Sequence, residues 1–187
     1  NQYVSAIKAG LMYDSRNVQN NPTKGIWAEA HAIVAPKWLG SSMDSYKISA
    51  TYRQYIPLGT DKLVFAYRLA YQGFLGKNTP WYLMPFYSNM GYTRDYDAIG
   101  GYRTTRGLML DRVQGLHTGF YNIELRYRFV DFQLANQNIA FALSGFTDGA
   151  HVFKGYDLTN RTGAKPELYK KYIDTSRADG LHASAGG

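Results

Sequence analysis

The feature that most restricts the fold of this chain is a strict alternation of apolar and polar side chains, sustained over long segments. The segment FYNIELRYRF, residues 120–129, is the clearest example. Its apolar side chains are Tyr121, Ile123, Leu125, Tyr127 and Phe129, and its polar ones are Asn122, Glu124, Arg126 and Arg128. Because successive side chains of a β-strand point to opposite faces, this segment predicts a strand with one apolar and one charged face.

The same alternation recurs along the chain, whereas helical periodicity is almost absent. It is found in VSAIKAGLMYD (4–14), DSYKISATYRQYI (44–56), KLVFAYRLAYQGF (62–74) and NIAFALSGFTD (138–148). It is weaker in GIWAEAHAIVAP (25–36), where Glu29 and His31 fall on the polar side. The segment LHASAGG (181–187) resembles the opening of a further strand, so the patterning predicts an all-β chain with about seven strands.

Two antiparallel architectures use strands of this kind. A soluble sandwich buries the apolar face, and its strands are typically about five or six residues long. A transmembrane barrel turns the apolar face to lipid, with strands of about 9 to 11 residues and aromatic belts at both interfaces. Strand length and the 17 tyrosines favour the barrel, and the sandwich stays open as the alternative. The tyrosines at or near predicted strand ends are Tyr3, Tyr13, Tyr46, Tyr55, Tyr71, Tyr121 and Tyr127.

The connections also fit an outer-membrane barrel, in which short periplasmic turns alternate with long outer loops. PLGTDK (57–62) and VDFQLANQN (130–138) predict short turns, and SRNVQNNPTKG (15–25) predicts a moderate one. The connections over 76–119 and 153–179 are long. An unstructured loop as long as 76–119 is uncommon in a compact soluble domain, whereas a barrel can fold such a loop into its own lumen.

Short motifs keep a recognisable order along the chain. In sequence they are DSRNVQNNPTKG, YRQYIPLG, MPFYSNM, GGYRTTRG, NIELR, FTDGAHVF and LHASAGG. Over nearly its whole length the chain resembles the barrel of the BamA/TamA outer-membrane assembly superfamily, which includes the two-partner secretion transporters. In that family the long loop carries an arginine–glycine motif, usually Val-Arg-Gly followed by Phe or Tyr, that tucks into the lumen. Here Thr105 precedes Arg106 and Gly107, and Leu108 stands in place of the aromatic residue.

The resemblance implies that Arg106 lies in the lumen, and simple electrostatics supports this. A guanidinium removed from bulk water needs carboxylate partners. Glu124 and Asp148 lie on the polar faces of two successive predicted strands, about 5 Å apart if those strands pair, and the resemblance suggests the same two positions. The alternative is that Arg106 is an exposed loop arginine and the two carboxylates are unrelated lumen charges. In the same loop, Gly100, Gly101 and Gly107 would allow the positive φ values and close backbone approach of a chain that doubles back.

The resemblance also implies a function. It predicts an outer-membrane barrel that inserts β-barrel proteins or translocates polypeptides, with lipid, client polypeptides and accessory assembly subunits as partners and no nucleic acid. Residues 1–187 would form one partial barrel domain, with the remaining strands and any periplasmic domains outside it. Two alternatives remain open: a passive porin or membrane anchor for a fused domain, and a soluble basic sandwich that binds nucleic acid or glycans through its tyrosines.

No catalytic or metal site is predicted. The formal charge of +7 suits an anionic partner but does not choose one. The chain has no cysteine, and GGYRTTRG is not a phosphate loop, because no Gly-Lys-Ser/Thr follows it at the required spacing. The four histidines lack metal-ligand spacing, and Arg106 accounts for Glu124 and Asp148 better than a catalytic pair does. We therefore expect a non-enzymatic protein without a cofactor. The segment KPELYKKYIDTSRADG (165–180) is expected to form a turn or two of solvent-exposed helix.

Overall fold

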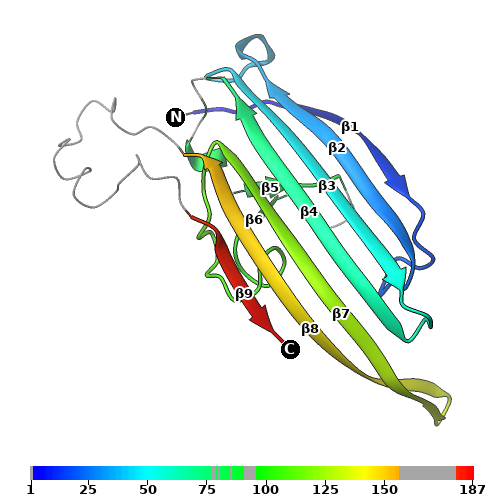
Figure 1. Cartoon of the computed structure of the whole chain (residues 1–187). Helices are drawn as coiled ribbons and strands as arrows, with labels where there is room; N and C mark the ends of the chain where they lie inside the picture. The colour runs from blue at the N-terminus through cyan, green and yellow to red at the C-terminus, as the bar shows by residue number, and fades with distance from the viewer. Residues whose placement is uncertain (1, 77–78, 80, 85, 91–95, 156–179) are drawn as a thin grey trace.

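The chain folds into one curved antiparallel sheet with a long loop on its inner face. The computed structural model describes residues 2–76, 79, 81–84, 86–90, 96–155 and 180–187. Its seven-stranded sheet has the order β1-β2-β3-β4-β7-β8-β9, with β1 and β9 at the edges (Figure 1). The strands are β1 (Ile7–Asp14), β2 (Gly25–Ala35), β3 (Ser45–Pro57), β4 (Leu63–Leu75), β7 (His117–Leu134), β8 (Gln137–Lys154) and β9 (His182–Gly186). The all-β prediction is confirmed. The seven strands form an open, curved sheet that is one part of a barrel wall.

The two faces of the sheet are inverted relative to a water-soluble protein. Polar side chains are buried on the concave face, which we call the lumen face, and apolar ones are exposed on the convex face. Buried lumen-face residues include Glu29, His31, Lys47, Ser49, Thr51 and Gln72. Exposed convex-face residues include Ile48, Leu69, Ile123, Leu125 and Tyr127. A soluble sandwich would bury that apolar face, so the arrangement is that of an outer-membrane barrel and the sandwich alternative is wrong.

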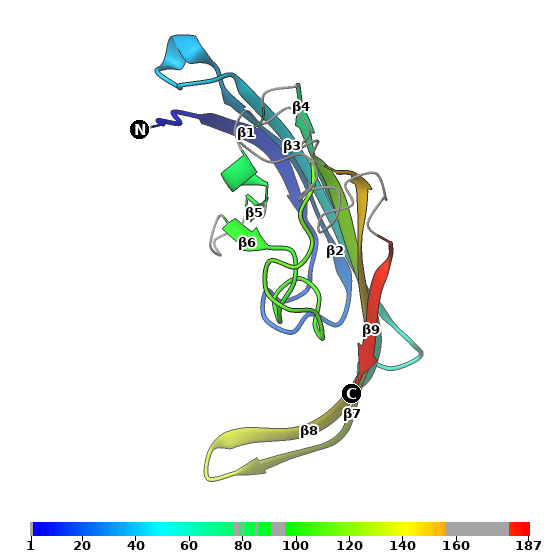
Figure 2. The same cartoon turned by 90° about the vertical axis from the view of Figure 1, so that its left-hand side faces the viewer.

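The connection between β4 and β7 crosses the lumen face (Figure 2). It contains the short 3-10 helix η2 (Trp81–Leu83) and a small two-stranded sheet of β5 (Phe86–Ser88) and β6 (Tyr96–Ala98). Strands of three residues are too short to give a periodic signal, which is why the sequence did not predict them. Another 3-10 turn, η1 (Lys37–Leu39), lies between β2 and β3. The folding of the long loop into the lumen is confirmed.

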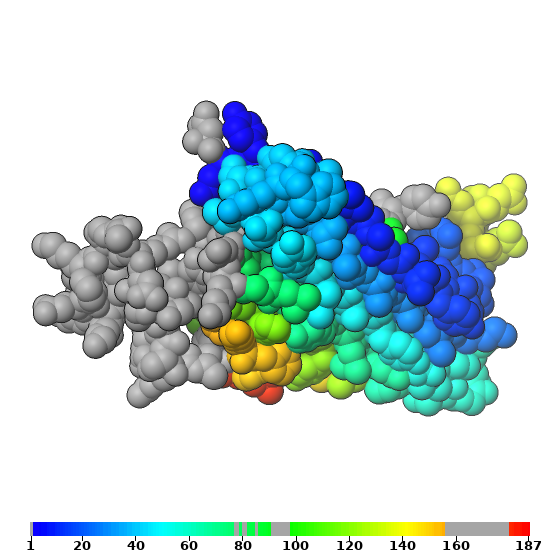
Figure 3. Space-filling model, turned by 90° about the horizontal axis from the view of Figure 1, so that it is seen from above, coloured from blue at the N-terminus to red at the C-terminus, as the bar shows by residue number. Residues whose placement is uncertain are grey.

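The hairpin of β7 and β8 is longer than the sequence predicted. The segment 130–138, interpreted as a turn, continues both strands, and only Ala135 and Asn136 form the turn, with φ of 49° and 62°. A register shift between Arg128 and Val130 moves the apolar residues from odd to even positions, so the pattern at odd positions ends although the strand continues. The tip extends past the ends of the neighbouring strands in Figure 1 and is the yellow group at the edge of Figure 3.

Two other expectations differ from the structure or fall outside it. Tyr55 does not belong to an outer aromatic belt, because it lines lumen-face cavities and its ring lies 5.8 Å from the Arg126 guanidinium. The predicted helix over 165–180 lies outside the described residues, apart from Gly180. Within the described part of the chain, no helix is long and apolar enough to span a membrane.

The assignment of faces can be tested with spin labels in a lipid bilayer. Labels at Leu69 and Leu125 should be quenched by lipid-soluble oxygen, since these side chains project from the convex face. A label at Ser144, which lines a lumen-face cavity, should be quenched by a water-soluble reagent instead. Electron paramagnetic resonance accessibility measures both, and the reverse pattern would contradict the assignment.

Candidate functional site

Arg106, at the tip of the long loop, lies between two carboxylates of the sheet. Its Nε and Nη2 donate to Oδ2 and Oδ1 of Asp148 on β8, at 2.8 and 2.9 Å. Its Nη1 donates to Oε2 of Glu124 on β7 at 2.8 Å, and its backbone N–H donates to Asp148 Oδ2 at 2.8 Å. The structure thus brings together the three residues that the sequence and the resemblance singled out.

The pairing register explains how one guanidinium reaches both carboxylates. Asp148 lies opposite Asn122, and Glu124 lies two residues further along β7, so the carboxylates are diagonal neighbours on the lumen face. The Asp148 side chain is fully buried and Arg106 is 28% exposed. The hydrogen bonds that Arg106 donates to Asp148 hold the pKa of the guanidinium above its usual value. The guanidinium also lies 3.7 Å from the centre of the Phe146 ring, so water is displaced from one of its faces.

Three glycines of the loop tip occupy conformations that other residues rarely adopt. Gly100, Gly101 and Gly107 have φ of 120°, 90° and 78°. A Cβ on Gly100 would lie 2.1 Å from the carbonyl oxygen of Met109, and one on Gly107 would lie 2.8 Å from the Cβ of Ser184 on β9. The glycines therefore allow both the tight fold-back of the tip and its close approach to the sheet.

The rest of the tip is held by a local turn and by apolar packing. The Gly100 N–H donates to the Thr104 hydroxyl at 2.9 Å, and that hydroxyl donates to the carbonyl of Ala98 at 2.8 Å. Leu108, which replaces the family's aromatic residue, packs against a buried apolar cluster. That cluster consists of Ala70, Tyr87, Ile99, Val113, Phe120, Ala150 and Val152. A smaller apolar side chain thus fills the position after the arginine–glycine pair.

A second arginine, Arg68 on β4, also holds the loop, and the sequence had placed it only on the polar face. Its Nη2 donates to the carbonyls of Arg103 and Thr104 at 2.8 and 2.9 Å, and its Nε donates to Asn122 Oδ1 at 2.6 Å. The Asn122 amide donates to the Thr104 carbonyl at 2.7 Å. Two lumen-face side chains therefore satisfy one loop carbonyl, which fixes the backbone beside Arg106.

The segment around β5 is fixed in the same way by the other half of the sheet. Lys47 donates to the carbonyl of Phe86 at 2.6 Å, and Lys8 donates to that of Asn89 at 2.5 Å. The Met90 N–H donates to Glu29 Oε2 at 2.8 Å, and Tyr87 shares a hydrogen bond with Thr51. With Ser184, whose hydroxyl donates to the carbonyl of Arg106, the loop is hydrogen-bonded to every strand of the large sheet.

Sequence reasoning found these side chains but not their partners. The alternation put Glu29, Lys47 and Arg68 on the polar face, yet their acceptors and donors are loop backbone groups with no sequence signature. Lys47 is only 6% exposed, and a buried lysine without a hydrogen-bond partner is costly, so its burial requires an acceptor nearby. The sequence signal for such partners was that the polar face carries many lysines and arginines but few carboxylates to pair with them.

The arrangement binds a loop and offers little for catalysis. Glu124 accepts from Arg106 and from Arg126, whose Nε lies 2.6 Å away, so neither it nor Asp148 is placed as a free acid or base. The described residues contain no group of three or more His, Asp and Glu side chains able to hold a metal ion. His31 is hydrogen-bonded to Ser88 and His117 to Tyr71.

Fold and site together define an outer-membrane-type barrel segment whose long loop is folded into the lumen and anchored by an arginine. The chain matches the Omp85 superfamily domain over residues 1–187 and belongs to that superfamily. This match confirms the family predicted from the order of the motifs.

A solved structure shows the same fold. The chain is similar to the crystal structure of BamA from Haemophilus ducreyi lacking POTRA domains 1-3, with a TM-score of 0.66 and 23% sequence identity. The similarity covers 97% of this chain and 35% of that one, so the chain spans about a third of the length of the BamA chain. A search of curated protein sequences finds no match.

Removing the Arg106 side chain should loosen the loop while the sheet persists. Arg106→Ala leaves Asp148 and Glu124 without their shared cation, which should cost about 2 to 4 kcal/mol of docking free energy. Protease cleavage between residues 76 and 119 should increase in the membrane-embedded full-length protein. Arg106→Lys should rescue only part, since an ammonium lacks the planar fork. A double-mutant cycle with Asp148→Asn should be non-additive, and strict additivity would make Arg106 an ordinary loop charge.

Gly107 and Gly59 form a matched pair for testing the close approach of the tip. Both have φ of 78°, but a Cβ would meet Ser184 at Gly107 and nothing within 4 Å at Gly59. Each change to alanine carries the left-handed backbone cost of about 1 kcal/mol. Gly107→Ala should in addition weaken loop docking by roughly 1 to 3 kcal/mol through overpacking. Protease protection of residues 76–119 should fall for Gly107→Ala alone, and equal effects would contradict close packing on β9.

Proposed function

We propose that this chain is part of an outer-membrane barrel that assists the insertion of β-barrel proteins or the translocation of polypeptides across that membrane. Its membership of the Omp85 superfamily supports the proposal. The observation that carries it is the Arg106 anchor. Together with the other loop contacts, it fixes the loop to all strands of the large sheet, so the lumen is filled by an ordered loop. The role is a non-enzymatic one that depends on shape and strand pairing.

The partners follow from this role. We infer that the convex face contacts outer-membrane lipid, and that clients are polypeptides destined for the membrane or for export, with accessory assembly subunits beside them. Further strands beyond residues 1–187 would complete the barrel, because both β1 and β9 present an open edge in a fold that depends on closure. Periplasmic domains would also lie outside these residues.

A passive porin is the alternative, and the position of the loop argues against it. Residues between β4 and β7 cross the lumen face and leave cavities of about 230 and 590 Å³ there. A porin lumen is an open aqueous channel. The same loop argues against a simple membrane anchor for a fused domain, because anchoring does not require a loop that is hydrogen-bonded to every strand.

The test is insertion of a client barrel into liposomes. The full-length protein should accelerate the folding of a urea-denatured outer-membrane barrel, followed by its heat-modifiable migration on gels. Arg106→Ala should slow this step about tenfold, equivalent to about 1.4 kcal/mol of barrier. Gly59→Ala, outside the loop, is the matched control and should keep the wild-type rate. Solute efflux without acceleration of folding would favour the porin instead.

A further inference from the structure

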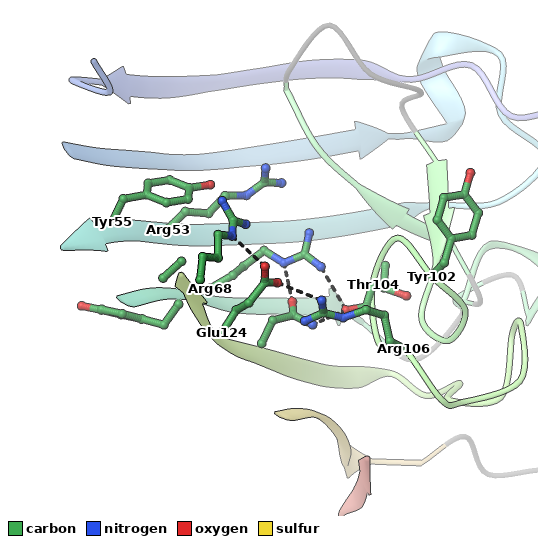
Figure 4. Close-up of a pocket in the computed structure, with 11 residues that line it drawn as sticks. Arg53, Tyr55, Arg68, Tyr102, Thr104, Arg106 and Glu124 are labelled. Atoms are coloured by element: carbon green, nitrogen blue, oxygen red, sulfur yellow. Dashed lines mark hydrogen bonds and ion pairs between the residues drawn. The ribbon is translucent and has the colours of Figure 1, made fainter. Parts of the chain in front are cut away.

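A cavity of about 230 Å³ lies on the lumen face beside the loop tip, and its walls are strongly basic. Four arginines line it, from three strands and the loop: Arg53, Arg68, Arg106 and Arg126. Glu124 is the one carboxylate among the lining residues. In Figure 4 the side chains of Arg53 and Arg68 project from neighbouring strands toward the same space.

The four arginines differ in whether their charge is compensated. Arg106 and Arg126 both pair with Glu124, and Arg106 also pairs with Asp148. Among the described residues, neither Arg53 nor Arg68 forms an ion pair with a carboxylate. Arg68 donates to loop carbonyls and to Asn122, and its guanidinium lies 4.7 Å from the Phe120 ring. Arg53 is attracted to Glu29 and Arg68 to Asp148 only at longer range, so in the described part of the chain the cavity holds two cations without a carboxylate in direct contact.

These two arginines lie directly opposite each other on β3 and β4. Like charges at directly opposed positions of an antiparallel pair destabilise the sheet. The Arg53 guanidinium lies 4.3 Å from the Trp27 ring, and its buried Nε has no hydrogen-bond partner. Glu29, on the adjacent strand β2, instead accepts from the Met90 N–H and forms no ion pair with Arg53. An anion between Arg53 and Arg68 would remove the repulsion and satisfy the free donor.

We propose that Arg53 and Arg68 bind a phosphate-class dianion in this cavity. Two guanidiniums without a contacting carboxylate match its charge of about −1.5 to −2 at pH 7. Arg53 can present its planar fork to the tetrahedral oxygens, whereas Arg68, whose Nε and Nη2 already donate to Asn122 and the loop carbonyls, adds a single donor from Nη1. The ligand is inorganic phosphate or a phosphate monoester on a lipid headgroup. Because Arg68 also donates to the carbonyls of Arg103 and Thr104, the bound anion touches a residue that holds the loop.

A larger basic cavity provides the route to this site. It has a volume of about 590 Å³ and shares Arg53, Tyr55, Glu124 and Arg126 with the first. From the turn end of the lumen it adds the cations Arg16, Lys62 and Arg128 and one carboxylate, Asp61. Its five cations outnumber its two carboxylates, and a cleft with an excess of one sign of charge raises the local concentration of its counter-ion, so an anion entering from the turn end is steered toward Arg53. Binding here does not depend on whether the barrel inserts or translocates polypeptides.

The test is phosphate binding by the full-length protein in nanodiscs of neutral lipid, measured by isothermal titration calorimetry. Arg53→Gln should weaken binding of inorganic phosphate by about tenfold or more. Lys24→Gln is the matched control, because it removes the same charge from an exposed residue of the β1–β2 turn that lines neither cavity, and it should change the affinity by less than about threefold. Heat-modifiable migration on gels confirms that each variant is folded.

Two results would overturn the proposal. One is equal loss of affinity in both variants, which would assign binding to the general positive field. The other is no wild-type binding up to about 1 mM phosphate. A second arm distinguishes the two sources: nanodiscs with phosphatidic acid should lower the apparent affinity for inorganic phosphate if a lipid headgroup fills the site. If the affinity is unchanged, the ligand is free phosphate.

Discussion

The ion pairs of Arg106 with Asp148 and Glu124 are the interaction on which the arrangement of the lumen depends. A loop of this length gains little from its own short strands and must be ordered by contacts with the sheet. Arg106 provides three donors to a buried carboxylate and one to a second carboxylate, and all of them are made at 2.8 to 2.9 Å. Because a desolvated carboxylate without its cation is costly, the sheet and the loop tip each require the other.

The loop has two attachment regions on opposite halves of the sheet. Arg106 and its neighbours are bound by β4, β7, β8 and β9, whereas the segment around β5 is bound by β1, β2, β3 and β4. A change in the curvature of the sheet must therefore alter at least one set of loop contacts, and displacement of the loop must leave buried polar groups on several strands unpaired. In a barrel that inserts or transports polypeptides, this coupling would make loop position and barrel shape interdependent.

The lumen face carries more cation than its own carboxylates neutralise. Arg106, Arg126 and Arg128 have carboxylate partners, but Lys47 is satisfied by a carbonyl and Arg53 mainly by the ring of Trp27. Backbone carbonyls and aromatic rings stabilise these cations through hydrogen bonds and cation–π contacts, but they carry no negative charge to neutralise them. The result is a polar interior that binds the neutral backbone of the loop and still attracts anions. Arginine allows both, because its guanidinium donates several hydrogen bonds while it keeps its positive charge.

The alternation of apolar and polar residues was enough to predict the strands of the large sheet and their two faces, because a period of two residues is a local property that needs no knowledge of neighbours. It favoured a barrel but left a soluble sandwich open, and the burial of the polar face in the folded chain excluded the sandwich. Through the resemblance the sequence also singled out Arg106, Glu124 and Asp148, which the structure places in contact. The folded structure was needed to show the extent of the β7–β8 hairpin, where a register shift hides the alternation, and the opposition of Arg53 to Arg68, which depends on strand register. It also decided the partners of Lys47 and Arg68, because their acceptors are backbone carbonyls. Every residue carries that group, so only the folded path of the loop selects which one is used.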